Sequence, residues 1–235
     1  MKITTVLFDL DGTLLPLEQD HFVATYFNYL AKKMAARGYE SESFIKSIVA
    51  GTKAMAANDG TYTNEEVFWR TFKSFHGEIP KEDAEAFDEF YRVEFQQVQS
   101  VCGCNPDAQM CVRELKEMGY KVGVATNPMF PAVATRSRVR WAGLDADDFV
   151  CCTTFENYRH CKPNPDYYLE VAEKIGIKPE ECLMVGNDVD EDMIAEKVGM
   201  KVFLHTDCLL NRHNKDISSY PQGSFKEVIK YLKTL

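Results

Sequence analysis

The stretch Val6-Leu7-Phe8-Asp9-Leu10-Asp11-Gly12-Thr13 constrains the fold more than any other part of this chain. An apolar run that ends in turn residues is typical of a strand buried on both faces of a parallel sheet. Asp9 and Asp11 follow it directly, so they lie at the edge where parallel sheets bind ligands. Two carboxylates this close repel one another unless one takes up a proton or a cation lies between them. The stretch therefore predicts a functional site at a strand end.

The composition indicates a folded protein with a large core and an acidic balance. Of its 235 residues, 45% are hydrophobic and 27% are charged, as in globular domains. The formal net charge is −9, so the chain lacks the basic stripe that nucleic-acid phosphates require, and we expect no nucleic-acid partner. An anionic substrate would therefore need local positive charge from a metal ion or a placed lysine.

Cysteine usage favours a reducing compartment. The chain has 8 cysteines, and several lie in apolar stretches such as Val150-Cys151-Cys152, where buried thiols are expected. The N-terminal residues lack a signal-peptide pattern, and no apolar run approaches the roughly 18 residues of a membrane span. We therefore expect a cytoplasmic protein with reduced thiols and no membrane partner.

Residues 16–97 show only helical patterns. Phe22, Tyr26 and Leu30 recur at helical spacing, and Thr63 with Glu66 forms the pattern of a capping box at a helix start. Further aromatic residues follow at helical spacing, among them Phe68, Phe72, Phe75, Phe87, Tyr91 and Phe95. These seams predict a small helical bundle, whose aromatic side chains we expect to form its own core.

Strands and helices alternate in the second half of the chain. We expect helices over 107–118 and 130–141, one beginning at Asn164-Pro165, one ending near Val198, and one beginning at Ser224. Strands are expected over 121–126, 149–153, 182–185 and 201–205. Repeated strand–helix units predict an α/β fold with a doubly wound parallel sheet, that is, a Rossmann-like core with helices on both faces.

The spacing of the strand ends locates an insertion. Thr126 follows Asp9 by 117 positions, whereas a strand–helix–strand unit takes on the order of 30 residues. Residues 1–15 and 98–235 therefore form the expected α/β catalytic core, and residues 16–97 form a helical cap inserted after the first strand. A helical unit at that edge can act as a lid over the site.

Polar residues follow three other strands of the expected sheet. Thr126 and Asn127 end the second strand, and Lys162 precedes a helix N-terminus, which favours anions. A dense acidic turn, Gly186-Asn187-Asp188 through Asp192, ends the fourth. Carboxylate oxygens together with substrate phosphate oxygens are the ligands that Mg²⁺ prefers. These strand ends therefore predict a site for a metal ion and a phosphoryl group.

The four segments resemble the four motifs of the haloacid dehalogenase (HAD)-like hydrolase superfamily. They are Asp9-Leu10-Asp11-Gly12-Thr13, Thr126-Asn127, Lys162-Pro163 and Gly186-Asn187-Asp188 through Asp192. They occur in the order of that family, and the helical insert resembles its type 1 cap. The resemblance covers nearly the whole chain.

The resemblance implies a role for each residue. Asp9 would be the nucleophile that forms an aspartyl phosphate, and Asp11 the general acid and then the base. Mg²⁺ would be held by the Asp9 carboxylate, the Asp11 backbone carbonyl and an acid of the fourth motif. Thr126, Asn127 and Lys162 would bind the phosphoryl oxygens.

The remaining motif residues would support these. Gly12 gives the turn conformational freedom and Thr13 fixes it. The fourth motif departs from the common Gly-Asp pattern, because it has Asn187 before Asp188. Either residue can stand at the metal, and Asp188 is favoured because an anion binds Mg²⁺ better than an amide. Asp192 would then orient Lys162 or a metal-bound water.

The implied function is a Mg²⁺-dependent phosphatase acting on a small phosphorylated metabolite. Asp11 argues against the dehalogenase branch, whose members resemble this chain but lack the second acid. A sugar-phosphate mutase on the same scaffold is the first alternative, and a non-catalytic phosphate-binding regulatory protein is the second. The regulatory protein would be expected to have lost Asp9, Asp11 or Lys162, all of which are present.

Four residues of the insert are candidates to face the substrate from the cap, although solvated surface is the favoured interpretation. They are Lys53, Asn58, Tyr62 and Arg70. The sequence carries no signal for oligomeric state.

Overall fold

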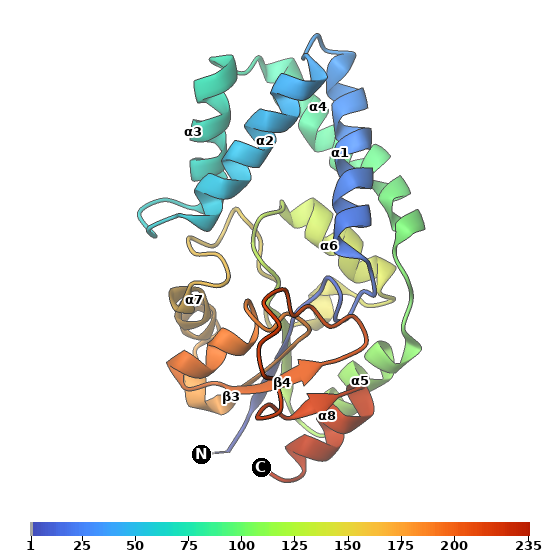
Figure 1. Ribbon diagram of the computed structural model, residues 1–235, viewed down its shortest axis with the longest axis vertical. Coiled ribbons are helices and arrows are strands. Elements are labelled where there is room, and N and C mark those ends of the chain that lie inside the picture. Colours follow the sequence, from blue (N-terminus) through green and yellow to red (C-terminus); the bar gives the residue numbers. More distant parts are fainter. Residues whose placement is uncertain (1) are drawn as a thin grey trace.

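The computed structural model describes residues 2–235 and consists of a parallel sheet flanked by helices, with a helical unit over one end (Figure 1). The strands are β1 (Thr5–Phe8), β2 (Lys121–Val124), β3 (Cys182–Gly186), β4 (Lys201–His205) and β5 (Gln222–Gly223). They lie in the order β2-β1-β3-β4-β5, and every pairing is parallel. Phe8, at the end of β1, pairs with Val124 of β2 and Val185 of β3. The residues that follow these strands therefore meet at one edge of the sheet.

Helices cover both faces of the sheet. One apolar cluster contains Val6 and Phe8 of β1 together with side chains from α5 (Pro106–Glu117), α6 (Ala132–Trp141) and α8 (Phe225–Leu232). The other contains Leu7 of β1 with side chains from α7 (Pro165–Ile175) and the 3₁₀ helix η4 (Met193–Val198). Successive strand residues point to opposite faces, so β1 contributes to both clusters. The expected doubly wound, Rossmann-like α/β core is confirmed.

A helical unit follows β1 and stands over the strand ends (Figure 1). It consists of α1 (Gln19–Ala35), α2 (Ser41–Ala56), α3 (Asn64–His76), α4 (Lys81–Arg92) and the 3₁₀ helix η1 (Glu94–Val101). Thr63 and Glu66 form the expected capping box at the start of α3. Phe72 packs between Phe44 and Phe87, with ring centroids 5.8 and 5.6 Å away.

Three local expectations were wrong. Phe75 does not belong to the buried seam of α3, because its side chain is 52% exposed. Residues 149–153 form no regular strand, although Cys152 makes an isolated bridge to Val124. The Thr153 amide donates to the Val124 carbonyl at 3.1 Å, and the Thr153 hydroxyl donates to the Thr126 carbonyl at 2.5 Å. The helix ending at Val198 is a short 3₁₀ helix, closed by Gly199 in the left-handed conformation.

The cysteines and the helices agree with a reduced protein without a membrane span. All eight cysteines are free thiols. Across residues 2–235, every helix is too short or too polar to cross a membrane.

Two further 3₁₀ helices lie in the connections between the larger elements. They are η2 (Ala146–Asp148) and η3 (Pro179–Glu181).

Candidate active site

Asp9 is fixed at the end of β1 by the two neighbouring strands. The amide of Asp9 donates to the carbonyl of Val185 at 2.9 Å, and the amide of Ala125 donates to the carbonyl of Phe8 at 2.7 Å. The Asp9 side chain projects beyond the sheet, yet the residue is only 7% exposed. A carboxylate in this position needs a partner of opposite charge.

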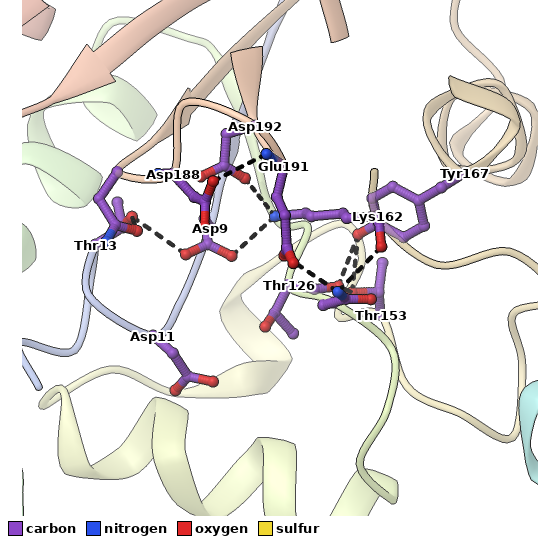
Figure 2. A network of polar contacts seen from close by, with 12 residues as sticks. Asp9, Asp11, Thr13, Thr126, Thr153, Lys162, Tyr167, Asp188, Glu191 and Asp192 are labelled. Carbon is purple, nitrogen blue, oxygen red and sulfur yellow. Dashed lines mark hydrogen bonds and ion pairs between the residues drawn. The ribbon is translucent and has the colours of Figure 1, made fainter. Parts of the chain in front are cut away.

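Lys162 provides that partner. Its Nζ donates to Oδ1 of Asp9 at 2.8 Å and to Oδ1 of Asp192 at 2.6 Å (Figure 2). Burial alone would lower the pKa of Lys162, but the carboxylates of Asp192 and Asp9 hold that pKa well above its usual value. Asp192 also accepts a hydrogen bond from the Asp188 amide at 2.9 Å, so it connects the lysine to the fourth motif. The three side chains form a fixed, charged unit.

The turn after β1 is fixed by Thr13. Its Oγ1 lies 3.2 Å from Oδ2 of Asp9 and 3.0 Å from Oδ1 of Asn187. Gly12 has a φ of +86°, and a Cβ atom added there would lie 2.4 Å from Nδ2 of Asn187. Only glycine combines this backbone conformation with this close approach.

Asp188 and Asn187 have different surroundings. Oδ1 of Asp188 accepts from the amides of Asp190 and Glu191 at 2.8 and 3.0 Å, and Oδ2 accepts from the guanidinium of Arg212. The Asn187 amide group instead donates to the carbonyl of Cys208 at 2.6 Å. Asp188 therefore presents a charged carboxylate to the site, whereas Asn187 ties together two loops.

Hydrogen bonds with neighbouring segments hold Thr126 and Asn127 in place. The carbonyl of Thr126 accepts hydrogen bonds from the Tyr167 and Thr153 hydroxyls at 2.8 and 2.5 Å. The Asn127 side chain donates to Oε2 of Glu191 at 3.1 Å. Burial raises the pKa of Glu191 to about 7. Within residues 2–235 the Thr126 hydroxyl has no hydrogen-bond partner.

Asp11 is set apart from the Asp9–Lys162 cluster (Figure 2). Its Oδ2 accepts from the guanidinium of Arg138, which is 1% exposed and lies over the ring of Phe130, 4.4 Å from the centroid. Oδ1 of Asp11 is buried and has no hydrogen-bond partner within residues 2–235. Burial raises the pKa of the Asp11 carboxyl, and Arg138 opposes that shift.

A cavity of about 160 Å³ joins these groups. The expected site residues that line it are Asp9, Asp11, Thr126, Asn127, Asn187, Asp188 and Asp192. Lys162 and Thr13 contact the Asp9 side chain, and Gly12 lies against that of Asn187. The sequence analysis missed Glu191, Arg212 and Gln19, which also line the cavity, and Arg138, which binds Asp11. Glu191 lies inside the acidic turn and could have been proposed; nothing in the sequence marks the two arginines.

The cavity fits a hard cation that takes few protein ligands. Within residues 2–235, no three His, Cys, Asp or Glu side chains are grouped closely enough to hold a metal ion by themselves. Mg²⁺ characteristically binds one or two carboxylates and completes its octahedron with carbonyl, water and phosphate oxygens. The carboxylates of Asp9 and Asp188 with the Asp11 carbonyl suit such an ion.

The four cap candidates do not line this cavity. The guanidinium of Arg70 lies over the ring of Tyr62, 3.5 Å from the centroid. Asn58 donates to the Asn64 side chain at 2.8 Å inside the helical unit. Their contacts are structural, and Lys53 is exposed.

Comparisons with known proteins agree with the fold and the motifs. The model of the family described as haloacid dehalogenase-like hydrolase matches residues 3–198. The chain is 26% identical over 201 residues to pyrophosphatase PpaX of Bacillus cereus (strain AH820) and to that of Bacillus mycoides (strain KBAB4), which covers 86% of this chain and 82% of each relative. The chain therefore belongs to the haloacid dehalogenase-like hydrolases and is an enzyme of that class.

Solved structures share the same fold. A HAD phosphatase from Thermococcus onnurineus is 23% identical, with a TM-score of 0.59 over 99% of this chain and 98% of that one. A 2-haloacid dehalogenase from Pseudomonas syringae pv. Tomato DC3000 is 19% identical, with a TM-score of 0.65 over 99% of both chains. Because phosphatases and dehalogenases both match, the shared fold does not identify the reaction.

Proposed function

We propose that this enzyme is a Mg²⁺-dependent phosphatase that hydrolyses a small phosphorylated metabolite through an aspartyl phosphate on Asp9. The observation that carries the proposal is the contact of buried Lys162 with both Asp9 and Asp192, together with a second acid, Asp11, that lines the same cavity as Asp9. A dehalogenase has no use for that second acid, because a halide leaves without a proton. The phosphatase and pyrophosphatase names of the relatives agree with this choice.

In the first step, an Asp9 carboxylate oxygen attacks phosphorus, and the bond from phosphorus to the leaving oxygen breaks. Asp11 gives its proton to that oxygen, so an alcohol leaves. In the second step, Asp11 removes a proton from water as the water oxygen attacks phosphorus, and the phosphorus–Asp9 bond breaks. Inorganic phosphate leaves, and both acids return to their starting states.

Lys162, Thr126 and Asn127 would bind the oxygens of the transferring phosphoryl group. Lys162 balances charge on Asp9 before and after transfer, since it already contacts that carboxylate at 2.8 Å. Groups held in place in advance stabilise the charge of the transition state without reorganising. Asp192 keeps the lysine in position.

Asp9, Asp188 and the Asp11 carbonyl would hold Mg²⁺, which offsets the repulsion between these carboxylates and the phosphate. Oδ2 of Asp188 is engaged by Arg212. Because the Arg212 side chain is 49% exposed, it can move aside when the cation binds. Residues 16–97 would serve as the cap that excludes water from the cavity.

Hydrolysis of p-nitrophenyl phosphate tests the proposal. The purified protein should release inorganic phosphate with Mg²⁺ and stop in excess chelator, and activity should return when Mg²⁺ is restored. Equal rates with and without chelator would contradict the metal mechanism. Release of free phosphate also separates this activity from that of a mutase, which returns the phosphoryl group to a sugar.

A further inference from the structure

A second cavity of about 240 Å³ lies beside the catalytic one. The two cavities share Gln19, Met129 and Phe130 as lining residues. The second is formed between the helical unit and the core, because its walls come from α1, α2, α3, α4 and the segments 129–131 and 155–156. A group bound there would be continuous with a phosphoryl group at Asp9.

Aromatic rings form a large part of its walls. The lining includes Tyr26, Phe27, Phe68, Trp69 and Phe155. Tyr26 and Phe130 pack edge to face with centroids 5.3 Å apart. The sequence analysis assigned these seams to the core of the insert, and they are in part that core: Phe68 is 8% exposed. They also leave a space, and an apolar cavity of about 150 Å³ already accepts benzene.

The charged residues that line this cavity, among residues 2–235, are all acidic. They are Glu65, Asp88 and Glu156, and no lysine or arginine is among the lining residues. Glu65 has no ion pair within residues 2–235, and its burial next to Glu156 raises its pKa. Oδ2 of Asp88 lies 3.9 Å from a guanidinium nitrogen of the exposed Arg92.

Glu156 is partly satisfied by the backbone. Its Oε1 accepts from the Ala132 amide at the start of α6, at 2.7 Å. Its Oε2 is buried and finds no hydrogen-bond donor in the described chain. A buried carboxylate oxygen without a donor is costly, so the cavity wall favours a bound group that supplies hydrogen-bond donors or positive charge.

We propose that this cavity binds the leaving group of the substrate, and that the substrate is a phosphate monoester of an aromatic alcohol carrying a protonated amine. This inference rests on the proposed phosphatase function. The rings bind the apolar part, and the carboxylates of Glu65 and Glu156 bind the ammonium. The same carboxylates repel a carboxylate or a second phosphate, so glycolate-type and pyrophosphate substrates are disfavoured.

Three matched esters test the charge preference: the O-phosphates of tyramine, 4-ethylphenol and 3-(4-hydroxyphenyl)propionate. They share a phenyl ring with a two-carbon chain, which ends in an ammonium group, in no further group or in a carboxylate. We expect kcat/KM to fall about tenfold at each step in that order, which corresponds to roughly 1.4 kcal/mol per step. Equal values for the three, or preference for the carboxylate ester or pyrophosphate, would overturn the proposal.

Two variants locate the effect. Glu65→Gln should reduce the ratio of the tyramine ester to the ethylphenyl ester about tenfold. Glu82→Gln makes the same charge change at an exposed position of α4 outside the cavity, and it should keep the wild-type ratio. An equal drop in both variants would show a general field effect and contradict a site at Glu65.

Binding separates this inference from the proposed function. Calorimetric titration of the Asp9→Asn variant with the same three esters should give the same order of affinities without turnover. If wild type hydrolyses no ester but this order holds, the phosphatase proposal fails and the cavity assignment stands. If the esters are hydrolysed but their binding shows no order, the cavity assignment fails and the phosphatase proposal stands.

Discussion

The guanidinium of Arg138 pairs with the carboxylate of Asp11, which lies apart from that of Asp9 (Figure 2). Arg138 is buried on α6, and its place is fixed further by Phe130 and by the Thr135 hydroxyl, 3.3 Å from its Nη2. Asp11, the proposed acid, is therefore bound to Arg138 and not to Asp9, the proposed nucleophile. For proton transfer to a leaving group, Asp11 must turn toward the cavity that it lines.

The buried pair should couple strongly to folding. Arg138→Met leaves Asp11 without its partner and should lower the free energy of unfolding by about 3 kcal/mol. Urea unfolding of the wild type, Arg138→Met, Asp11→Asn and the double variant gives the coupling energy between the two side chains. We expect this energy to exceed about 1 kcal/mol, which is roughly the upper limit for exposed pairs. The exposed pair of Arg136, also on α6, and Asp147 is the matched control. Its charged atoms are 2.7 Å apart, and its side chains are 53% and 76% exposed. A coupling no larger than that of the control would show that the Arg138 contact contributes little.

The role of Asp11 should depend on the leaving group. Asp11→Asn removes the proton donor, so alkyl phosphates should lose on the order of 10²–10⁴ in kcat/KM. Aryl phosphates with acidic phenols need less protonation and should lose less. Rates measured across a series of leaving groups check this, and an equal loss for all of them would contradict the acid role.

Gly12 should be needed for the shape of the site. Gly12→Ala places a Cβ 2.4 Å from Asn187 in a residue with φ of +86°, so both stability and activity should fall. Gly38→Ala has a similar φ of +94° and no atom within 4 Å of the new Cβ. It should show only the backbone cost, roughly 1–2 kcal/mol, with activity retained. Thermal unfolding and phosphatase assays of both variants make the comparison, and the account is wrong if Gly38→Ala loses as much activity as Gly12→Ala.

His205 should make stability depend on pH. It is fully buried at the end of β4 with its ring 4.3 Å from that of Phe225, and burial lowers its pKa below the usual 6.5, against the attraction of Asp207. The unfolded chain therefore binds a proton at a pH where the folded protein does not. Stability should thus fall as the pH drops below about 6.5, by at most roughly 1.4 kcal/mol per pH unit.

His205→Leu removes this group while keeping a side chain of similar volume. Urea unfolding at several pH values should then show a shallower loss of stability on the acid side than in the wild type. An unchanged slope would assign the acid sensitivity to other groups.

Prediction from sequence succeeded where a local pattern carries the structural information. Buried strands, the turn at Gly12 and the capping box at Thr63 each depend on adjacent residues, and the HAD-like class and the α/β core are confirmed. Arg138 could not be foreseen, because its contact with Asp11 joins residues 127 positions apart. The cavity wall at Glu65 and Glu156 likewise exists only once the helical unit packs on the core.

At Val150 to Thr153 the sequence predicted a regular strand that the structure does not form. Their apolar character predicts a strand, and the Val150 amide does donate to the Val122 carbonyl at 2.9 Å. The Thr153 amide likewise donates to the Val124 carbonyl at 3.1 Å, while its hydroxyl donates to the Thr126 carbonyl. These residues therefore run beside β2 and bond to it without forming a regular strand.

Hydrolysis of an aryl phosphate by Asp9→Asn, compared with wild type at the same Mg²⁺ concentration, tests the central claim most directly. The substitution keeps size and shape but removes the attacking anion, and circular dichroism with a thermal melt verifies that the variant is folded. The account predicts a loss of at least about 10³-fold in kcat, the scale seen when a nucleophile is removed. A folded Asp9→Asn protein that retains kcat within tenfold of wild type would contradict it.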